Sequence, residues 1–182
     1  AGSNKKRVEG QKLIGLAQKA FFAQKSRIDL SRNQLLLRGN RYCYFYEPGL
    51  NNRVLINDEF KTIRASIDLL NLSVQEKWYR KLAREQLVCR ITTLANKLNL
   101  PVKKVFIRGQ KTKLGNCSEG KNISLNWRLM KAPEVVSDYI IIHELVHTRI
   151  MSHSSKFWTY LKSLCPDYQI AIDWLEKYGN SL

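Results

Sequence analysis

The stretch that decides the fold of this chain is residues 140–147, which read Ile-Ile-Ile-His-Glu-Leu-Val-His. His143 and His147 are four residues apart, so on a helix they share one face and both imidazoles can reach a single Zn²⁺ ion. Glu144 is turned by about 100° from His143 and can lie beside that ion, where its carboxylate would accept a proton from water. The spacing therefore predicts an HExxH zinc site with Glu144 as general base.

The apolar neighbours of Glu144 support this interpretation. Residues 140–142, Leu145 and Val146 make the expected helix apolar nearly all round. A carboxylate inside such a helix is costly unless it has a partner such as a metal site. Chance placement of two histidines and a glutamate on an ordinary buried helix explains the pattern less well.

A catalytic zinc ion needs a third protein ligand, and His153 is the expected one. Six residues after His147 a helix has rotated by about 600°, so His153 cannot share its face. The helix must therefore end near Met151, and the chain must turn back. Carboxylates fill the third place in another class of HExxH enzymes, which leaves three alternatives further along the chain: Asp167, Asp173 and Glu176.

Hydrophobic periodicity, turn residues and helix caps predict the remaining elements. Ser73 and Glu76 fit a capping box, which places the start of a long helix at Ser73. Expected helices cover residues 8–25, 73–98, 133 towards 151, and 154 or 155 to 165, and expected strands cover residues 35–37, 42–46, 53–56, 105–107 and 123–127. This order predicts an α+β fold with an active-site helix beside a small sheet. We expect a helical and β-rich N-terminal part at 1–72 and a catalytic domain at 73–182.

Composition narrows the class of protein. The chain has 182 residues and a formal net charge of +16, and its longest unbroken apolar run, residues 42–46, is far too short to cross a bilayer. We therefore expect a cytoplasmic protein without a membrane partner. Its four cysteines form no CxxC pair, and we expect them to be reduced and mostly buried thiols. Residues 86–118 carry basic side chains and no acidic ones. Such a surface predicts nonspecific binding of nucleic acid through its phosphates.

The three histidines have the spacing of two other metalloprotein signatures. The metzincin pattern HExxHxxGxxH requires glycine where this chain has Ile150, and no methionine follows His153 to form the Met-turn. The pattern is also similar to the HGxxHxxGxxH signature of the bacterial ribosomal-RNA-processing metalloproteins, in which glycine stands at the positions of Glu144 and Ile150. Metzincin membership is therefore not expected.

A longer resemblance covers roughly the C-terminal 110 residues and fades before Trp78. It is carried by Lys-Leu-Gly-Asn-Cys-Ser at 113–118, Ile-Ser-Leu-Asn-Trp-Arg-Leu at 123–129, the stretch 138–147, and the segments around residues 153–158 and 166–168. These segments resemble the YgjP-like (SprT-like) zinc metallopeptidases. The resemblance implies a zincin-like core, zinc on His143, His147 and His153, and Glu144 as catalytic residue. It also implies a strand near residues 122–129 to which a peptide could add as an extra strand.

The sequence thus predicts a zinc-dependent metallopeptidase that acts on a protein or peptide substrate. Two alternatives share the same histidines. One is a metal-dependent nuclease, and the other is a nucleic-acid-binding protein with a structural zinc. Closed structural sites usually have four protein ligands, commonly cysteines, and no CxxC pair lies beside these histidines.

Overall fold

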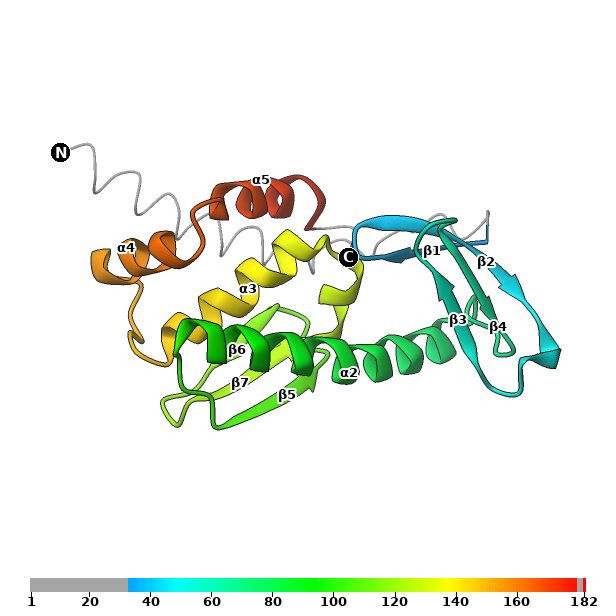
Figure 1. The fold of residues 1–182 in the computed structure, drawn as a ribbon, viewed down its shortest axis with the longest axis horizontal. Helices are drawn as coiled ribbons and strands as arrows, with labels where there is room; N and C mark the ends of the chain where they lie inside the picture. Colours follow the sequence, from blue (N-terminus) through cyan, green and yellow to red (C-terminus); the bar gives the residue numbers. More distant parts are fainter. Residues whose placement is uncertain (1–32, 180–181) are drawn as a thin grey trace.

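A computed structural model describes residues 33–179 and 182 of the chain, so the helix expected at 8–25 lies outside the described residues. Two small sheets lie at either end of a long helix, α2 (Leu72–Leu98) (Figure 1). The second sheet is covered by α3 (Glu134–His147), and two further helices lie beyond α3. This arrangement is the predicted α+β class. Within the described residues, no helix combines the length and the apolar character needed to cross a membrane.

The first sheet has the strand order β1-β2-β4-β3. Its strands are β1 (Gln34–Leu37), β2 (Asn40–Tyr46), β3 (Val54–Asn57) and β4 (Thr62–Ala65). Arg38 and Gly39 join β1 to β2 with φ angles of 48° and 76°, as a two-residue type I′ hairpin requires. Strands β1, β2 and β3 lie where strands are predicted, although β2 begins two residues before its predicted start. Strand β4 was not predicted, because its four residues carry too little pattern.

Helix α2 begins slightly earlier than the capping box predicts. Asn71 is its N-cap, and the Asn71 side chain accepts hydrogen bonds from the backbone N–H groups of Ser73 and Val74. Placing the cap at Ser73 was wrong, because Asn71 offers the same kind of acceptor two residues earlier. Glu76, the other half of the predicted box, instead pairs with Arg80 one turn further along.

The second sheet has the strand order β5-β7-β6 and consists of β5 (Lys104–Arg108), β6 (Gly115–Cys117) and β7 (Asn122–Asn126). β7 pairs parallel with β5 and antiparallel with β6. The strand that the family resemblance implies for peptide addition is therefore the central one, and both its edges are already paired. A peptide that adds to this sheet has to use an outer strand, and β6 is the outer strand that contacts α3.

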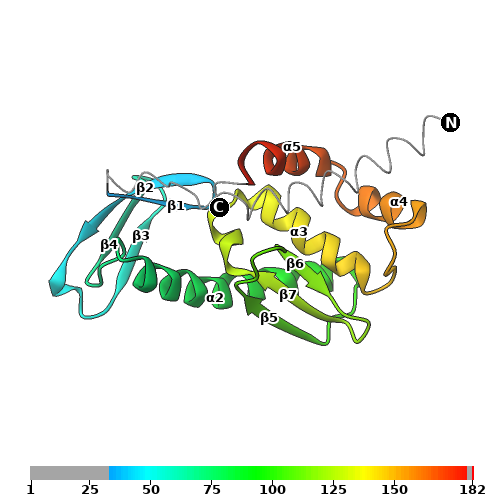
Figure 2. The same ribbon diagram turned by 180° about the vertical axis from the view of Figure 1, so that it is seen from behind.

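Helix α3 begins after Pro133, as predicted, but ends at His147, earlier than the expected end near Met151. Two more helices follow, α4 (Ser155–Leu164) and α5 (Tyr168–Tyr178). Both pack against α3, and Figure 2 shows them on the opposite side of α3 from the second sheet. The break after His147 sets the position of His153.

The two ends of the molecule are joined by hydrogen bonds as well as by α2. The backbone N–H groups of Arg38 and Gly39 donate to the carbonyls of Met130 and Lys131 over 2.8 and 2.9 Å. The Tyr79 hydroxyl of α2 donates to the Leu36 carbonyl of β1. The division of the chain into domains at 1–72 and 73–182 stays a prediction. The hydrogen bonds above connect residues of the first range with residues of the second.

The cysteines agree only in part with the prediction. All four are free thiols, but Cys43 and Cys89 are exposed and Cys117 and Cys165 are half-buried. The prediction of mostly buried thiols was wrong, because Cys43 lies on the outer side of β2 and Cys89 on the solvent side of α2.

Replacement of Gly39 by alanine should destabilise the protein by about 1–3 kcal/mol. Its φ of +76° disfavours a side chain, and a Cβ there would lie 2.6 Å from Cγ of Pro133. Gly49→Ala is the matched control, because a Cβ at Gly49 meets nothing within 4 Å. Urea unfolding of both variants measures the difference, and equal midpoints would contradict the proposed packing.

Candidate metal centre

Three histidine side chains converge at the end of α3. His143 and His147 lie one turn apart on the helix, and His153 reaches them from the segment between α3 and α4. The Nε2 atoms of His143 and His147 are 3.2 Å apart, and Nε2 of His153 lies 3.1 Å from each. The helix break thus brings together three nitrogens that the sequence separates.

This triangle has the dimensions of a tetrahedral zinc site. Nitrogens bound 2.0–2.1 Å from a tetrahedral zinc ion lie roughly 3.3–3.4 Å apart, close to the observed spacing. Each Nε2 offers one direction in its ring plane for a proton or a ligand. A cation among the three nitrogens could satisfy all of them, and these histidines form a group that could hold a metal ion.

Burial keeps the imidazoles neutral, which is the form that binds metal. Desolvation lowers the pKa of His143 well below its ordinary value, with the neighbouring histidines adding to the effect. Burial likewise lowers the pKa of His147 and brings that of His153 to about 4. The lone pairs of these rings are therefore available at neutral pH.

A backbone contact and an aromatic ring orient the histidines. Nδ1 of His147 lies 3.0 Å from the Ile150 carbonyl, so this nitrogen carries the proton and Nε2 is left as the acceptor or ligand atom. The buried Phe157 ring of α4 packs against His143, His147 and His153 at centroid distances of 4.9, 4.6 and 4.8 Å. Sequence reasoning placed Phe157 on a helix but missed this contact, since no local pattern distinguishes it from ordinary core packing.

Glu144 is buried beside the histidines, and its side chain lies against β6. A Cβ added to Gly115 would come within 2.6 Å of Oε1 of Glu144, so the absence of a side chain at Gly115 makes room for the carboxyl group. Burial raises the pKa of Glu144 to about 8, opposed by the charge of Lys113 and by a hydrogen bond from the Cys117 backbone. Sequence reasoning missed these roles of Lys113, Gly115 and Cys117, although the segment 113–118 carried part of the family resemblance.

The three carboxylates considered as alternative ligands do not join this group. Among the described residues, the cluster of possible ligand atoms around His143 contains only histidines, so Asp167, Asp173 and Glu176 lie outside it. Near the site in sequence, Arg149 donates a hydrogen bond from Nη2 to the Asn99 carbonyl at the end of α2 over 2.7 Å.

Comparison with models of known protein families identifies the family of this chain. The chain belongs to the YgjP-like metallopeptidase domain family, whose match covers residues 10–178. The mixed sheet beside α3 and the strand-rich N-terminal part fit a zincin-like metallopeptidase domain. Comparisons with curated proteins and with solved structures find no significant match.

The family match corrects the extent of the resemblance described above. That resemblance fades before Trp78, whereas the match begins at residue 10 and includes the first sheet. The N-terminal part therefore belongs to the family domain. Its short strands and turns lack the dense functional motifs by which the C-terminal part is recognised.

Replacement of Gly115 by alanine should destabilise the protein by roughly 1–3 kcal/mol, because the added methyl overlaps the Glu144 side chain. In a Glu144→Ala background the same change should cost much less, since the overlapping group is gone. Gly120→Ala is the control, because its nearest contact would be an ordinary 3.4 Å. Chemical unfolding of the four proteins in this cycle measures the coupling, and additive effects would show that the two residues do not touch.

Proposed function

We propose that this protein is a single-zinc metallopeptidase in which His143, His147 and His153 hold the ion. The observation that carries the proposal is the triangle of Nε2 atoms at 3.1 to 3.2 Å, with no carboxylate or thiol joining it among the described residues. Three protein ligands leave the fourth tetrahedral position for water or substrate, as in catalytic zinc sites. A closed structural site would need a fourth protein ligand.

A zinc ion bound here would act as a Lewis acid on the scissile carbonyl and lower the pKa of the attacking water. Glu144 takes the proton of that water and later returns it to the leaving amine. A carboxyl group whose pKa is raised to about 8 can both accept and donate a proton near neutral pH. The Lys113 charge and the Cys117 hydrogen bond favour the ionised form that starts the cycle.

The substrate is a protein or peptide, and β6 is the strand that would bind it. Leu114 and Ser118, at the two ends of β6, use their peptide groups to bond β7. By antiparallel alternation, the peptide groups of Gly115 and Cys117 point away from β7, and the Cys117 backbone hydrogen-bonds the Glu144 carboxyl group. An extended peptide along this edge would meet the N–H and C=O groups of Gly115 next to the general base.

The ligand assignment predicts the effect of a single substitution. His153→Ala should lower zinc affinity by at least tenfold, because it removes one of three donors. Asp173→Ala and Glu176→Ala are controls that should keep the zinc of the parent. Competition with a chromogenic chelator measures all four proteins. Zinc retained by His153→Ala but lost from either control would refute the assignment.

The same site predicts release of zinc in acid. Imidazoles must be neutral to bind, so protons compete with the ion once the pH falls towards the histidine pKa values, of which that of His153 is about 4. Affinity should change little around neutral pH and fall as the pH drops towards these lowered pKa values. Chelator competition at several pH values tests this, and affinity that rises with acidification would contradict it.

Glu144→Gln separates the peptidase from its two alternatives. Glutamine keeps the size of the side chain and all three histidines, so zinc should remain bound while cleavage of casein falls by about 100-fold or more. A nuclease would instead cut RNA or DNA and leave casein intact. A structural site would leave both polymers uncut by the parent. Gly120→Ala, which changes an ordinary contact, is the activity control.

A further inference from the structure

The outer face of the second sheet carries a set of side chains that the proposed peptidase chemistry does not use. Along β5, Val105 and Ile107 turn inward to the core, while Lys104, Phe106 and Arg108 alternate outward and are exposed. Phe106 keeps 38 % of its surface in contact with solvent. Phe106 thus lies exposed in the middle of the strand, between the cations of Lys104 and Arg108.

The neighbouring strands extend this outward row with polar groups. Phe106 is in register with Ser124 of β7, and Ser124 is in register with Asn116 of β6. Lys104 is in register with Asn122. The strands β5, β6 and β7 contain no acidic residue. The face therefore combines an exposed ring, two cations and hydrogen-bonding side chains, without a carboxylate on its strands.

We propose that this face binds single-stranded nucleic acid, with Phe106 as the stacking platform for a base and with Lys104 and Arg108 binding phosphates. Exposed aromatic rings flanked by cations bind unpaired bases, because every base has a face that can stack and every linkage carries a charge. The guanidinium of Arg108 lies over the Phe106 ring, 5.2 Å from its centroid. Arg108 therefore covers part of this ring in the free protein, and a base would stack there as the guanidinium turns to an adjacent phosphate.

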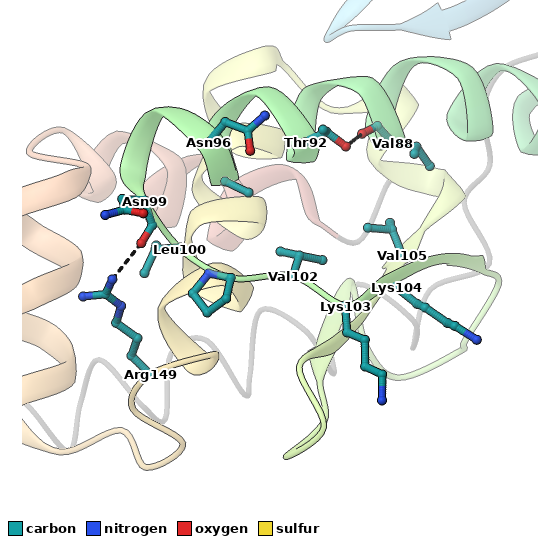
Figure 3. A pocket seen from close by; sticks show the side chains of 12 residues that line it. Val88, Thr92, Asn96, Asn99, Leu100, Val102, Lys103, Lys104, Val105 and Arg149 are labelled. Carbon is teal, nitrogen blue, oxygen red and sulfur yellow. Dashed lines mark hydrogen bonds between the residues drawn. The ribbon is translucent and has the colours of Figure 1, made fainter.

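Positive charge continues from this face around the free edge of β5. A groove of about 790 Å³ lies between α2 and the segment that leads into β5, and its lining includes Lys103, Lys104 and Arg149. Figure 3 shows Lys103 and Lys104 extending away from α2, with Arg149 at the other end of the groove. Lys104 belongs to both surfaces. A strand of several nucleotides that stacks on Phe106 could therefore keep phosphate contacts beyond the sheet.

The aromatic ring is what favours nucleic acid over an acidic protein segment. A carboxylate-rich peptide would be attracted by the cations alone and would gain little from a solitary exposed ring. Duplex DNA offers phosphates but keeps its bases stacked inside, so it cannot use Phe106. The proposal thus commits to unpaired bases, and it is independent of the peptidase activity.

The test is binding of a fluorescein-labelled 20-mer of uridine to the purified full chain, measured by anisotropy at several salt concentrations. Phe106→Ala should weaken binding roughly tenfold, the loss of one stacked base. Lys104→Ala with Arg108→Ala should weaken it further and reduce the slope of log K against log salt by about 1.4, because two phosphate contacts are lost. Circular dichroism and zinc content verify that the variants are folded.

Matched controls change the same residue types elsewhere. Phe60→Ala removes another exposed phenylalanine, and Lys77→Ala with Arg84→Ala removes one lysine and one arginine exposed on α2. These controls should bind the oligonucleotide like the parent. Equal losses in Phe106→Ala and Phe60→Ala would overturn the proposal. So would equal affinity for a duplex of the same length, or equally effective competition by polyglutamate, since either would show attraction of any polyanion.

Discussion

The rest of the structure depends on the burial of three polar side chains in the last turn and a half of an apolar helix, with a fourth, His153, brought to them from the following segment. His143, Glu144 and His147 are each less than one-tenth exposed, and His153 completes the cluster. Desolvation opposes charge on every one of them, which is why the histidine pKa values fall and the glutamate pKa rises. A divalent cation in the proposed position would offset this cost for all four groups at once. Elements packed around α3 keep water out and so set these pKa values.

The end of α3 is as important as its sequence. Were the helix to continue through His153, that side chain would leave the face of the other two histidines, since six residues correspond to about 600° of rotation. The chain instead leaves the helix after His147, and the Ile150 carbonyl accepts a hydrogen bond from the ring of that residue. One contact thus orients a histidine and holds the turn that returns His153. Phe157 then fills the space behind the three rings.

Sequence reasoning works here where one periodicity decides the outcome. The i and i+4 spacing of His143 and His147 requires only a helix, and the rotation argument for His153 requires only that the helix end. Features that depend on contact between distant segments were missed: no local pattern shows that Gly115 has to be bare because Glu144 lies against it. Strand β4 was missed for a related reason, since it is stabilised by pairing on both sides with β2 and β3 rather than by its own four residues.

Because side chains alternate along its strands, the second sheet has an inner face next to Glu144 and an outer face that carries the cations of β5. On the inner face of β6, Gly115 lies against the buried carboxyl group of Glu144. The next residue, Asn116, faces outward and is in register with Ser124, which is in register with Phe106. A shift of one residue in this register would exchange the two faces, putting the cations of β5 into the apolar core. Burial of Ile123 and Leu125 makes such a shift costly. The same hydrophobic core therefore has the buried cluster of His143, Glu144 and His147 on one side of the sheet and the basic surface on the other.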